Sequence, residues 1–254
     1  MLKKLNWAFE AVIIWFLYVG TWPVLRIMYP RRIIWEDKKA TDKVMKKPCV
    51  IYSNHTGYSD GVFAFDILRK YYPYTFIGKD WYEKNVLFHR LLMHRRYIPL
   101  DREQMDTSWL MKGKKVVEDG YSIFFFPEGH TSKDGLLLEF QPGFLMLAKQ
   151  GNIPLVPICL DRKVDFFKPV RVIIGKPIYI DFTKEPGRPS VVLKKYAEIC
   201  KDAIIDLKDR YGNPKFVTDD VIKYREKKAA AEKTSEEVGG ETVATADAEM
   251  KAAE

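Results

Sequence analysis

The sequence contains few cysteines and few histidines, and neither kind is arranged as a scaffold or a metal module. Its 254 residues include three cysteines and four histidines. Cys49, Cys159 and Cys200 lie inside apolar segments, without disulfide-framework spacing and without metal-ligand spacing to one another or to a histidine. This pattern excludes a disulfide-rich secreted domain and predicts buried thiols in a protein that faces a reducing compartment.

The basic residues lack the clustering that is typical of nucleic-acid-binding proteins. The chain carries a net charge of +8, and its last 29 residues hold eight acidic and four basic side chains, so residues 1–225 carry +12. Lysine and arginine occur as scattered pairs, such as Lys3-Lys4 and Arg95-Arg96, without a basic helix or zinc-finger spacing. We therefore expect an anionic partner, such as a membrane surface or a phosphorylated molecule, and no nucleic acid.

The N-terminus lacks an apolar run long enough to cross a bilayer as a single helix. Residues 11–25 form an uncharged run of 15 residues, whereas a spanning helix needs roughly 20. Four tryptophans lie within residues 1–35, basic residues flank the run, and Pro23 interrupts it. Tryptophan prefers the headgroup level of a membrane. These features predict that residues 1–35 form two short helices embedded in one leaflet, at the cytoplasmic face; an apolar helix packed on the domain is the alternative.

Short apolar runs alternate with amphipathic segments from residue 48 onward. Strands are predicted at residues 48–53, 74–78, 96–100, 121–126, 154–160 and 170–175, and helices at residues 60–72, 79–94, 104–118, 144–150 and 190–211, with Ser190 as a helix cap. This alternation predicts an α/β fold with a central, mostly parallel or mixed sheet covered by helices. We assign residues 36–225 to this domain. Residues 226–254 have almost no large apolar side chains and are predicted to be a disordered tail.

Polar residues of a catalytic kind follow the first of these strands. His55 comes directly after the strand, and Asp60 lies five residues later. Histidine suits proton transfer near neutral pH, and a carboxylate on its other ring nitrogen fixes the tautomer. The intervening residues can turn because Gly57 is free to adopt a positive φ. The alternative is an ordinary helix entry, with Ser59 or Asp60 as the N-cap.

Two further loops carry polar or basic residues that active sites use. One is Phe126-Pro127-Glu128-Gly129-His130-Thr131-Ser132-Lys133, which follows a very apolar strand and offers backbone N–H groups and an acid. The other contains Arg102, whose planar fork suits phosphate oxygens. Taken alone, the first loop could be a plain polar turn and Arg102 a solvated charge. Ligands gather at the carboxyl ends of strands in α/β sheets, so these loops can converge.

The loops together resemble the lysophosphatidate (1-acyl-sn-glycerol-3-phosphate) acyltransferase family. Asn54-His55-Thr56-Gly57-Tyr58-Ser59-Asp60 fits its NHxxxxD motif, and Phe126-Pro127-Glu128-Gly129 opens its FPEGTRS-like motif. Ile98-Pro99-Leu100-Asp101-Arg102 resembles its second motif, and Val156-Pro157-Ile158 its fourth. The motifs occur in the expected order.

The resemblance implies transfer of a fatty acyl group from a thioester to the sn-2 hydroxyl of 1-acyl-glycerol-3-phosphate, giving phosphatidate. It implies a glycerolipid acyltransferase fold, His55 and Asp60 as catalytic residues, and Arg102 as a ligand of the acceptor phosphate. It also implies that Glu128 and Gly129 position the acceptor. The donor would be acyl-CoA or acyl carrier protein as a co-substrate, and neither a cofactor nor a metal is expected.

One residue departs from the family pattern. Thr131 stands where the third motif commonly has arginine, and Lys133 and Lys79 are candidates to replace that phosphate contact. The acceptor therefore stays open, with another lysophospholipid, a lyso-aminolipid and glycerol 3-phosphate as alternatives. Two other classes also remain: a non-catalytic phospholipid-binding module, and a metal-dependent hydrolase that uses His55, Asp60, Glu128 and His130.

Overall fold

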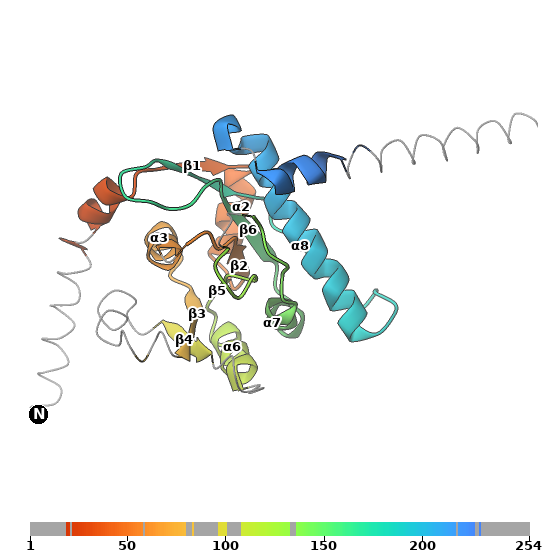
Figure 1. Ribbon diagram of the computed structural model, residues 1–254. Coiled ribbons are helices and arrows are strands. Elements are labelled where there is room, and N and C mark those ends of the chain that lie inside the picture. The colour runs from red at the N-terminus through yellow and green to blue at the C-terminus, as the bar shows by residue number, and fades with distance from the viewer. Residues whose placement is uncertain are drawn as a thin grey trace, which may run out of the picture.

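The fold is a seven-stranded mixed sheet with helices on both faces (Figure 1). The computed structural model describes residues 19–20, 22–57, 59–79, 83, 96–100, 108–132, 136–216, 218–226 and 229. The strands lie in the order β1-β7-β6-β2-β5-β3-β4. They are β1 (Arg31–Trp35), β2 (Val50–Ser53), β3 (Tyr74–Gly78), β4 (Tyr97–Leu100), β5 (Ile123–Phe125), β6 (Leu155–Leu160) and β7 (Val170–Ile174). The predicted α/β class and mixed sheet are confirmed.

Helices cover the sheet in two separate layers. They are α2 (Lys38–Met45), α3 (Asp60–Ile67), α6 (Ser108–Glu118), α7 (Gly143–Gly151) and α8 (Pro189–Tyr211), followed by the 3-10 turn Pro214–Phe216. One core cluster packs α7 and α8 against the sheet, with Phe144, Leu147 and Cys200 at its centre. The other packs α2 and α3 against the opposite face through Met45 and Phe63. Strands β2 and β6 are buried along their whole length because both faces are covered.

The strand directions decide which loops meet. Strands β2, β3, β4, β5 and β6 run parallel, so their carboxyl ends share one edge of the sheet, which we call the carboxyl edge. Strand β7 is antiparallel to β6, and β1 is parallel to β7. The chain therefore enters β1 at the carboxyl edge, so the residues that precede Arg31 lie at the same edge as the loops after β2 and β5.

Two details of the predicted elements are corrected. The sequence predicts membrane helices over residues 1–35, but Arg31–Trp35 form the edge strand β1, because five consecutive residues pair with β7. Ser190 does not cap α8: the N-cap is Arg188, and Pro189 occupies the first turn, where its missing N–H is not needed. Helix α2, with Asp37 as its N-cap, was not predicted.

The membrane prediction falls largely outside the described residues, which exclude 1–18 and 21. Residues 22–28 are helical. Within the part of the chain that the structure describes, no helix combines the length and apolar character needed to cross a bilayer. Of the predicted tail, only Glu226 and Ala229 are described, and both are helical.

A buried ion pair ties β1 to α3. The guanidinium of Arg31 contacts the carboxylate of Asp66, and each side chain is only 4% exposed. Burial raises the pKa of Asp66 and lowers that of Arg31, although their mutual attraction opposes both shifts. Removing one partner of such a pair is strongly destabilising, because the remaining charge is left buried and uncompensated.

Asp66→Ala should therefore lower the free energy of unfolding by about 3 kcal/mol, measured by urea denaturation. Glu118→Ala is the control, since its partner Lys114 is 3.6 Å away on the exposed face of α6, and it should leave the midpoint nearly unchanged. Equal midpoints for the two variants would contradict a structural role for the Arg31–Asp66 pair.

Candidate active site

The residue before the histidine joins the ends of two strands. The Asn54 side chain donates to the Leu160 carbonyl at 2.9 Å and accepts from the Leu160 N–H at 2.8 Å. A carboxamide can make this reciprocal pair because it carries both a donor and an acceptor, like a peptide group. Asn54 is 5% exposed. It therefore continues the β2–β6 pairing for one more step and fixes where the chain leaves the sheet.

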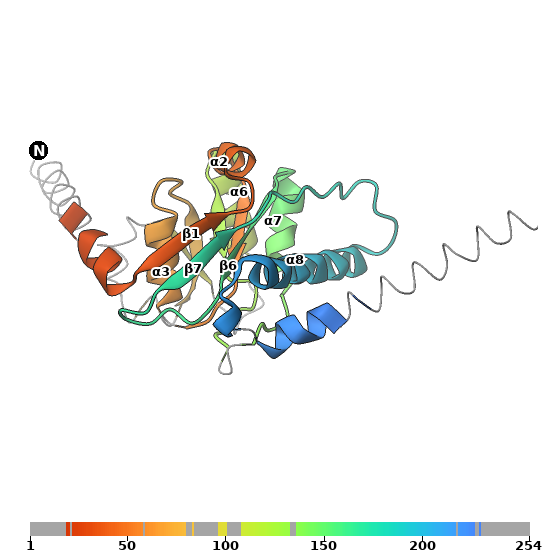
Figure 2. The ribbon, with the colours of Figure 1, turned by 90° about the horizontal axis from the view of Figure 1, so that it is seen from above.

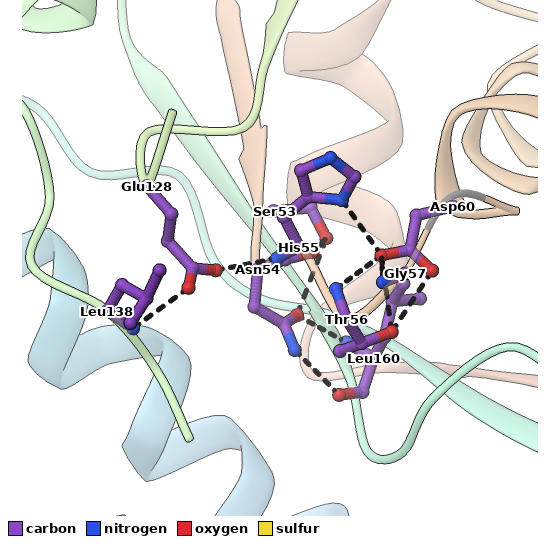
Figure 3. Close-up of polar contacts among 9 residues, drawn as sticks. All are labelled: Ser53, Asn54, His55, Thr56, Gly57, Asp60, Glu128, Leu138 and Leu160. Carbon is purple, nitrogen blue, oxygen red and sulfur yellow. Dashed lines mark hydrogen bonds and ion pairs between the residues drawn. The ribbon is translucent and has the colours of Figure 1, made fainter. Parts of the chain in front are cut away.

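His55 and Asp60 form the predicted pair (Figure 3). The Nδ1 atom of His55 lies 3.0 Å from Oδ2 of Asp60, and the other ring nitrogen, Nε2, points away from the carboxylate. The Asp60 side chain is fully buried, whereas the His55 side chain is 19% exposed. A buried carboxylate on one ring nitrogen and an accessible second nitrogen is the arrangement that a general base requires.

The Asp60 carboxylate also shapes the loop that carries the histidine. It accepts hydrogen bonds from the backbone N–H of Thr56 and from that of Gly57, the latter at 2.7 Å, and from the Thr56 hydroxyl at 3.0 Å. Asp60 is the first residue of α3, whose preceding residue Ser59 makes no side-chain cap. The carboxylate thus turns back onto the loop. Ser59 occupies the N-cap position of α3, as the alternative predicted, but neither Ser59 nor Asp60 caps the helix with its side chain.

Gly57 serves the loop in a different way from the one predicted. Its φ is not positive; Gly120, Gly129 and Gly187 are the described glycines with positive φ. A Cβ at Gly57 would meet the Lys163 side chain, with Cε at 3.2 Å. The Lys163 side chain lies across the loop at this point, so a larger residue at position 57 would press against it.

The imidazole of His55 is also fixed from the side. Its ring stacks on Phe126 with centroids 4.2 Å apart and an interplanar angle of 16°. Phe126 in turn meets Phe124 edge to face at 4.8 Å. Stacking against a packed aromatic ring limits rotation of the imidazole about its Cβ–Cγ bond. The ring is therefore oriented before any substrate arrives.

Glu128 supports the histidine from the opposite side. One carboxylate oxygen accepts the His55 backbone N–H at 2.6 Å, and the other accepts the Leu138 N–H at 2.8 Å. The residue is 4% exposed. Burial raises the pKa of the Glu128 carboxyl, and the two N–H donors oppose the shift. Figure 3 shows Glu128 and Asp60 on opposite sides of the His55 backbone. That Glu128 contacts the acceptor stays a prediction.

The loop after β5 turns sharply and returns to the histidine. Gly129 has φ +72, and its N–H donates to the Phe126 carbonyl at 3.1 Å. The N–H of Ser132 donates to the His55 carbonyl at 3.2 Å. Thr131 is therefore next to a residue that contacts the loop carrying His55, which places the position that departs from the family pattern beside the His55–Asp60 pair.

The remaining predicted site residues are distributed along the carboxyl edge or lie outside the described residues. Lys79 directly follows β3 and its side chain is exposed. Because β3 is two strands from β2, Lys79 is about 10 Å from the histidine along the edge. Arg102 and Lys133 are not among the described residues. Arg96 precedes β4 at the opposite edge, where its guanidinium covers the ring of Tyr72 at 3.8 Å.

Sequence reasoning passed over a second pattern in the same loop. Gly57-Tyr58-Ser59-Asp60-Gly61 also fits the G-x-S-x-G elbow of serine hydrolases. Ser59 lies six residues beyond β2, has ordinary helical backbone angles, and meets the Tyr29 hydroxyl at 3.4 Å. An elbow serine instead follows its strand directly in a strained turn, so the geometry does not match. The described residues also contain no cluster of three histidine, cysteine, aspartate or glutamate side chains suited to a metal ion.

Comparison with known proteins agrees with this geometry. The family model described as Acyltransferase matches residues 32–161, about half of the chain. The chain belongs to the acyltransferase family. This family match covers the pair His55–Asp60, the Glu128 loop and the Asn54 clamp in one continuous segment.

Curated acyltransferases resemble the same part of the chain. A chloroplastic 1-acyl-sn-glycerol-3-phosphate acyltransferase of Brassica napus is 33% identical over 144 residues, which is 52% of this chain and 41% of that protein. The human 1-acyl-sn-glycerol-3-phosphate acyltransferase beta is 25% identical over 133 residues, covering 48% and 44%. The chain thus spans about two fifths of the length of these relatives.

A solved structure shares the fold. The crystal structure of the 1-acyl-sn-glycerophosphate acyltransferase PlsC from Thermotoga maritima matches with a TM-score of 0.51 and 18% identity, over 83% of this chain and 84% of that one. At this identity the likeness concerns the fold alone, and it agrees with the mixed sheet described above.

Glu128→Gln should loosen the histidine loop. A carboxamide can accept only one of the two N–H groups and presents its own NH₂ to the other, which leaves a buried donor without an acceptor. We expect a loss of about 1–3 kcal/mol in unfolding free energy and faster hydrogen exchange at the His55 and Leu138 amides. Glu139→Gln is the matched control, because that side chain is 78% exposed. Unchanged exchange at both amides would contradict this role of Glu128.

Proposed function

We propose that this protein is a 1-acylglycerol-3-phosphate O-acyltransferase, which moves a fatty acyl group from a thioester to the sn-2 hydroxyl of 1-acyl-glycerol-3-phosphate and produces phosphatidate. The observation that carries the proposal is the buried Asp60 carboxylate 3.0 Å from His55 Nδ1, with Nε2 facing away. Family membership and the names of the similar curated proteins support the acyl-transfer chemistry and the acceptor.

The proposed reaction needs one proton to move twice. His55 Nε2 takes the proton of the acceptor hydroxyl while the oxygen attacks the thioester carbonyl. Asp60 stabilises the imidazolium without taking the proton. The tetrahedral intermediate then collapses, the carbon–sulfur bond breaks, and His55 returns the proton to the leaving thiolate. The products are the new ester and a free thiol, with no covalent enzyme intermediate.

The acceptor phosphate would bind along the carboxyl edge. Lys79 directly follows β3 at this edge, and in the sequence Arg102 comes two residues after β4 and Lys133 eight residues after β5. Arginine and lysine suit a phosphate dianion at neutral pH. Thr131 in place of arginine leaves a hydroxyl that can donate only one hydrogen bond. Another lysophospholipid, a lyso-aminolipid or glycerol 3-phosphate is therefore the alternative acceptor.

Two other classes are less well supported. A non-catalytic lipid-binding module would not need a buried carboxylate behind an accessible imidazole. In a metal-dependent hydrolase, Asp60 and Glu128 would supply ligand oxygens, but here these oxygens accept hydrogen bonds from His55, Gly57 and Leu138. A metal ion would therefore compete with these N–H donors for the same oxygens.

The substrates also account for the predicted membrane association. A lysophospholipid and its product reside in a bilayer, and the apolar, aromatic N-terminus on a basic domain suits docking at the cytoplasmic face. The donor, acyl-CoA or acyl carrier protein, would approach from the aqueous side, and no cofactor takes part in the proposed step.

His55→Ala should lower kcat by at least about 10³-fold while circular dichroism and the melting temperature stay close to the wild type. The assay is release of free thiol from acyl-CoA with lysophosphatidate. His130→Ala is the matched control, because His130 is exposed in the neighbouring loop, and it should keep activity, also in the presence of a chelator. Normal turnover by His55→Ala, or loss of turnover with the chelator, would reject the mechanism.

A substrate panel tests the acceptor and the donor. We expect lysophosphatidate to be acylated faster than lysophosphatidylcholine, a lyso-aminolipid or glycerol 3-phosphate, with acyl-CoA and acyl carrier protein thioesters tested side by side and His55→Ala as the blank. Thr131→Arg should lower the KM for lysophosphatidate by roughly fivefold to tenfold, since a charged donor replaces a neutral one. A preference for an acceptor without a terminal phosphate would identify one of the alternatives.

A further inference from the structure

The loop between β6 and β7, residues 161–169, exposes two aromatic rings that sequence analysis did not single out. Phe166 is 54% exposed and Phe167 is 68% exposed. Phe167 has φ +57, a backbone conformation that bulky residues rarely adopt and that costs of order 1–3 kcal/mol. The turn is stabilised by a hydrogen bond from the Phe167 N–H to the Met28 carbonyl at 2.7 Å. The fold thus holds an exposed apolar ring on a strained backbone, and such strain clusters at ligand-binding sites.

This loop lies beside the helix that precedes β1. Phe166 stacks on Tyr29 with ring centroids 5.0 Å apart, and the Val170 N–H donates to the Pro30 carbonyl. Both views of the ribbon show the loop and this helix side by side at one end of the molecule (Figures 1 and 2). The helix adds exposed apolar side chains: Trp22 is 42%, Val24 51% and Ile27 69% exposed.

Cations accompany the apolar side chains of both segments. Arg26 lies over the ring of Trp22 at 5.8 Å. In the loop, Lys163 is exposed, and the side chain of Lys168 is 57% exposed beside Asp165. Apolar rings accompanied by lysine and arginine suit the boundary between acyl chains and anionic headgroups. A second copy of this chain is a poorer match as the partner of this surface. Residues 1–225 of each copy carry +12, so the two copies would repel each other.

The β6–β7 loop contacts the segment that carries His55 and Asp60. It begins after Leu160, which the Asn54 side chain clamps, and the stem of Lys163 lies across Gly57, whose N–H binds Asp60. Because β1 is antiparallel to β6, the helix before β1 is at this same carboxyl edge. A surface that contacts both the loop and the helix would therefore lie next to His55.

We propose that residues 162–168 and the helix at residues 22–28 form one docking surface for an anionic phospholipid bilayer, with Phe166 and Phe167 inserted at the headgroup level. This inference rests on the proposed function, since it presents the acyl-transfer site to the membrane that contains the acceptor. It goes further by assigning membrane contact to the β6–β7 loop, in addition to the N-terminal residues.

The first test reports insertion at the loop itself. Phe167→Cys is labelled with a polarity-sensitive maleimide dye, and Tyr179→Cys is the matched control, because Tyr179 is 70% exposed beside the start of β6, at the opposite edge of the sheet. Cys49, Cys159 and Cys200 are buried, and burial raises the pKa of the Cys49 and Cys200 thiols to about 11 and about 12, so they should not compete for the dye. Vesicles of phosphatidylcholine and phosphatidylglycerol should blue-shift the dye at position 167 but not at 179, and nitroxide-labelled acyl chains should quench it.

The second test measures binding. Phe167→Asn removes the ring and keeps a residue that tolerates positive φ, and Tyr179→Asn makes the same change at the remote site. In vesicle sedimentation, Phe167→Asn should lower the partition coefficient between vesicles and water about tenfold, and Tyr179→Asn should leave it unchanged. Raised salt should weaken binding of all forms.

Acyl transfer by the wild type on the same vesicles separates the two proposals. Turnover without a spectral change at position 167, or equal partitioning of the two asparagine variants, overturns the docking surface and leaves the enzyme proposal standing. Insertion at position 167 without turnover overturns the enzyme proposal and leaves the docking surface standing. A spectral shift that depends on protein concentration without lipid would identify a second copy as the partner and would also overturn the proposal.

Discussion

The arrangement of the site depends on one buried carboxylate. Asp60 is fully buried, and a carboxylate removed from water is costly unless hydrogen-bond donors surround it. Here the donors are the N–H groups of Thr56 and Gly57, the Thr56 hydroxyl and the ring of His55. The loop between strand and helix must adopt the one conformation that brings these donors together. The same requirement therefore specifies both the fold of the loop and the tautomer of the histidine.

Contacts from neighbouring strands extend this constraint across the sheet. Asn54 connects the end of β2 to the end of β6, Glu128 connects His55 to the segment at Leu138, and Ser132 returns to the His55 carbonyl. Glu128 and Ser132 bind the backbone of His55, and Asn54 uses its own side chain, so none of these contacts competes for the imidazole. In the proposed mechanism Nε2 is thus left for the substrate, in a ring that Phe126 already orients.

The directions of β1 and β7 bring this site close to the segments that we propose to face the membrane. If β7 had been parallel to β6, the chain would enter β1 at the opposite edge, far from His55. The antiparallel β6–β7 pair instead brings the helix at residues 22–28 and the β6–β7 loop to the edge where β2 and β5 end. In the proposed enzyme, this topology lets one surface contact lipid while the neighbouring edge performs the chemistry.

The central strands and the His55–Asp60 pair could be predicted from the sequence because the patterns that indicate them are local. Strands such as Val50–Ser53 and Leu155–Leu160 are continuous apolar runs, and a histidine five residues before an aspartate after a strand indicates a pair. Strand β1, with Arg31 and Arg32 in it, was missed because an edge strand with charged residues has no such run.

The sequence by itself determined the α/β class and the glycine-bearing loop after β5, since each follows from residue type and spacing along the chain. The resemblance of its motifs to the acyltransferase family selected the pair His55–Asp60 over an ordinary helix entry. Only the tertiary structure decided what these residues touch. Glu128 supports the histidine backbone, Gly57 makes room for Lys163, and Asp60 binds the loop rather than capping its helix. The contact of Asp60 with the loop is local, but the roles of Glu128 and Gly57 depend on strand order and direction, which bring together residues that are 70 to 110 positions apart, as Glu128 and Leu160 are from His55 and Asn54. No local pattern encodes such pairings, because they arise from the packing of the whole sheet.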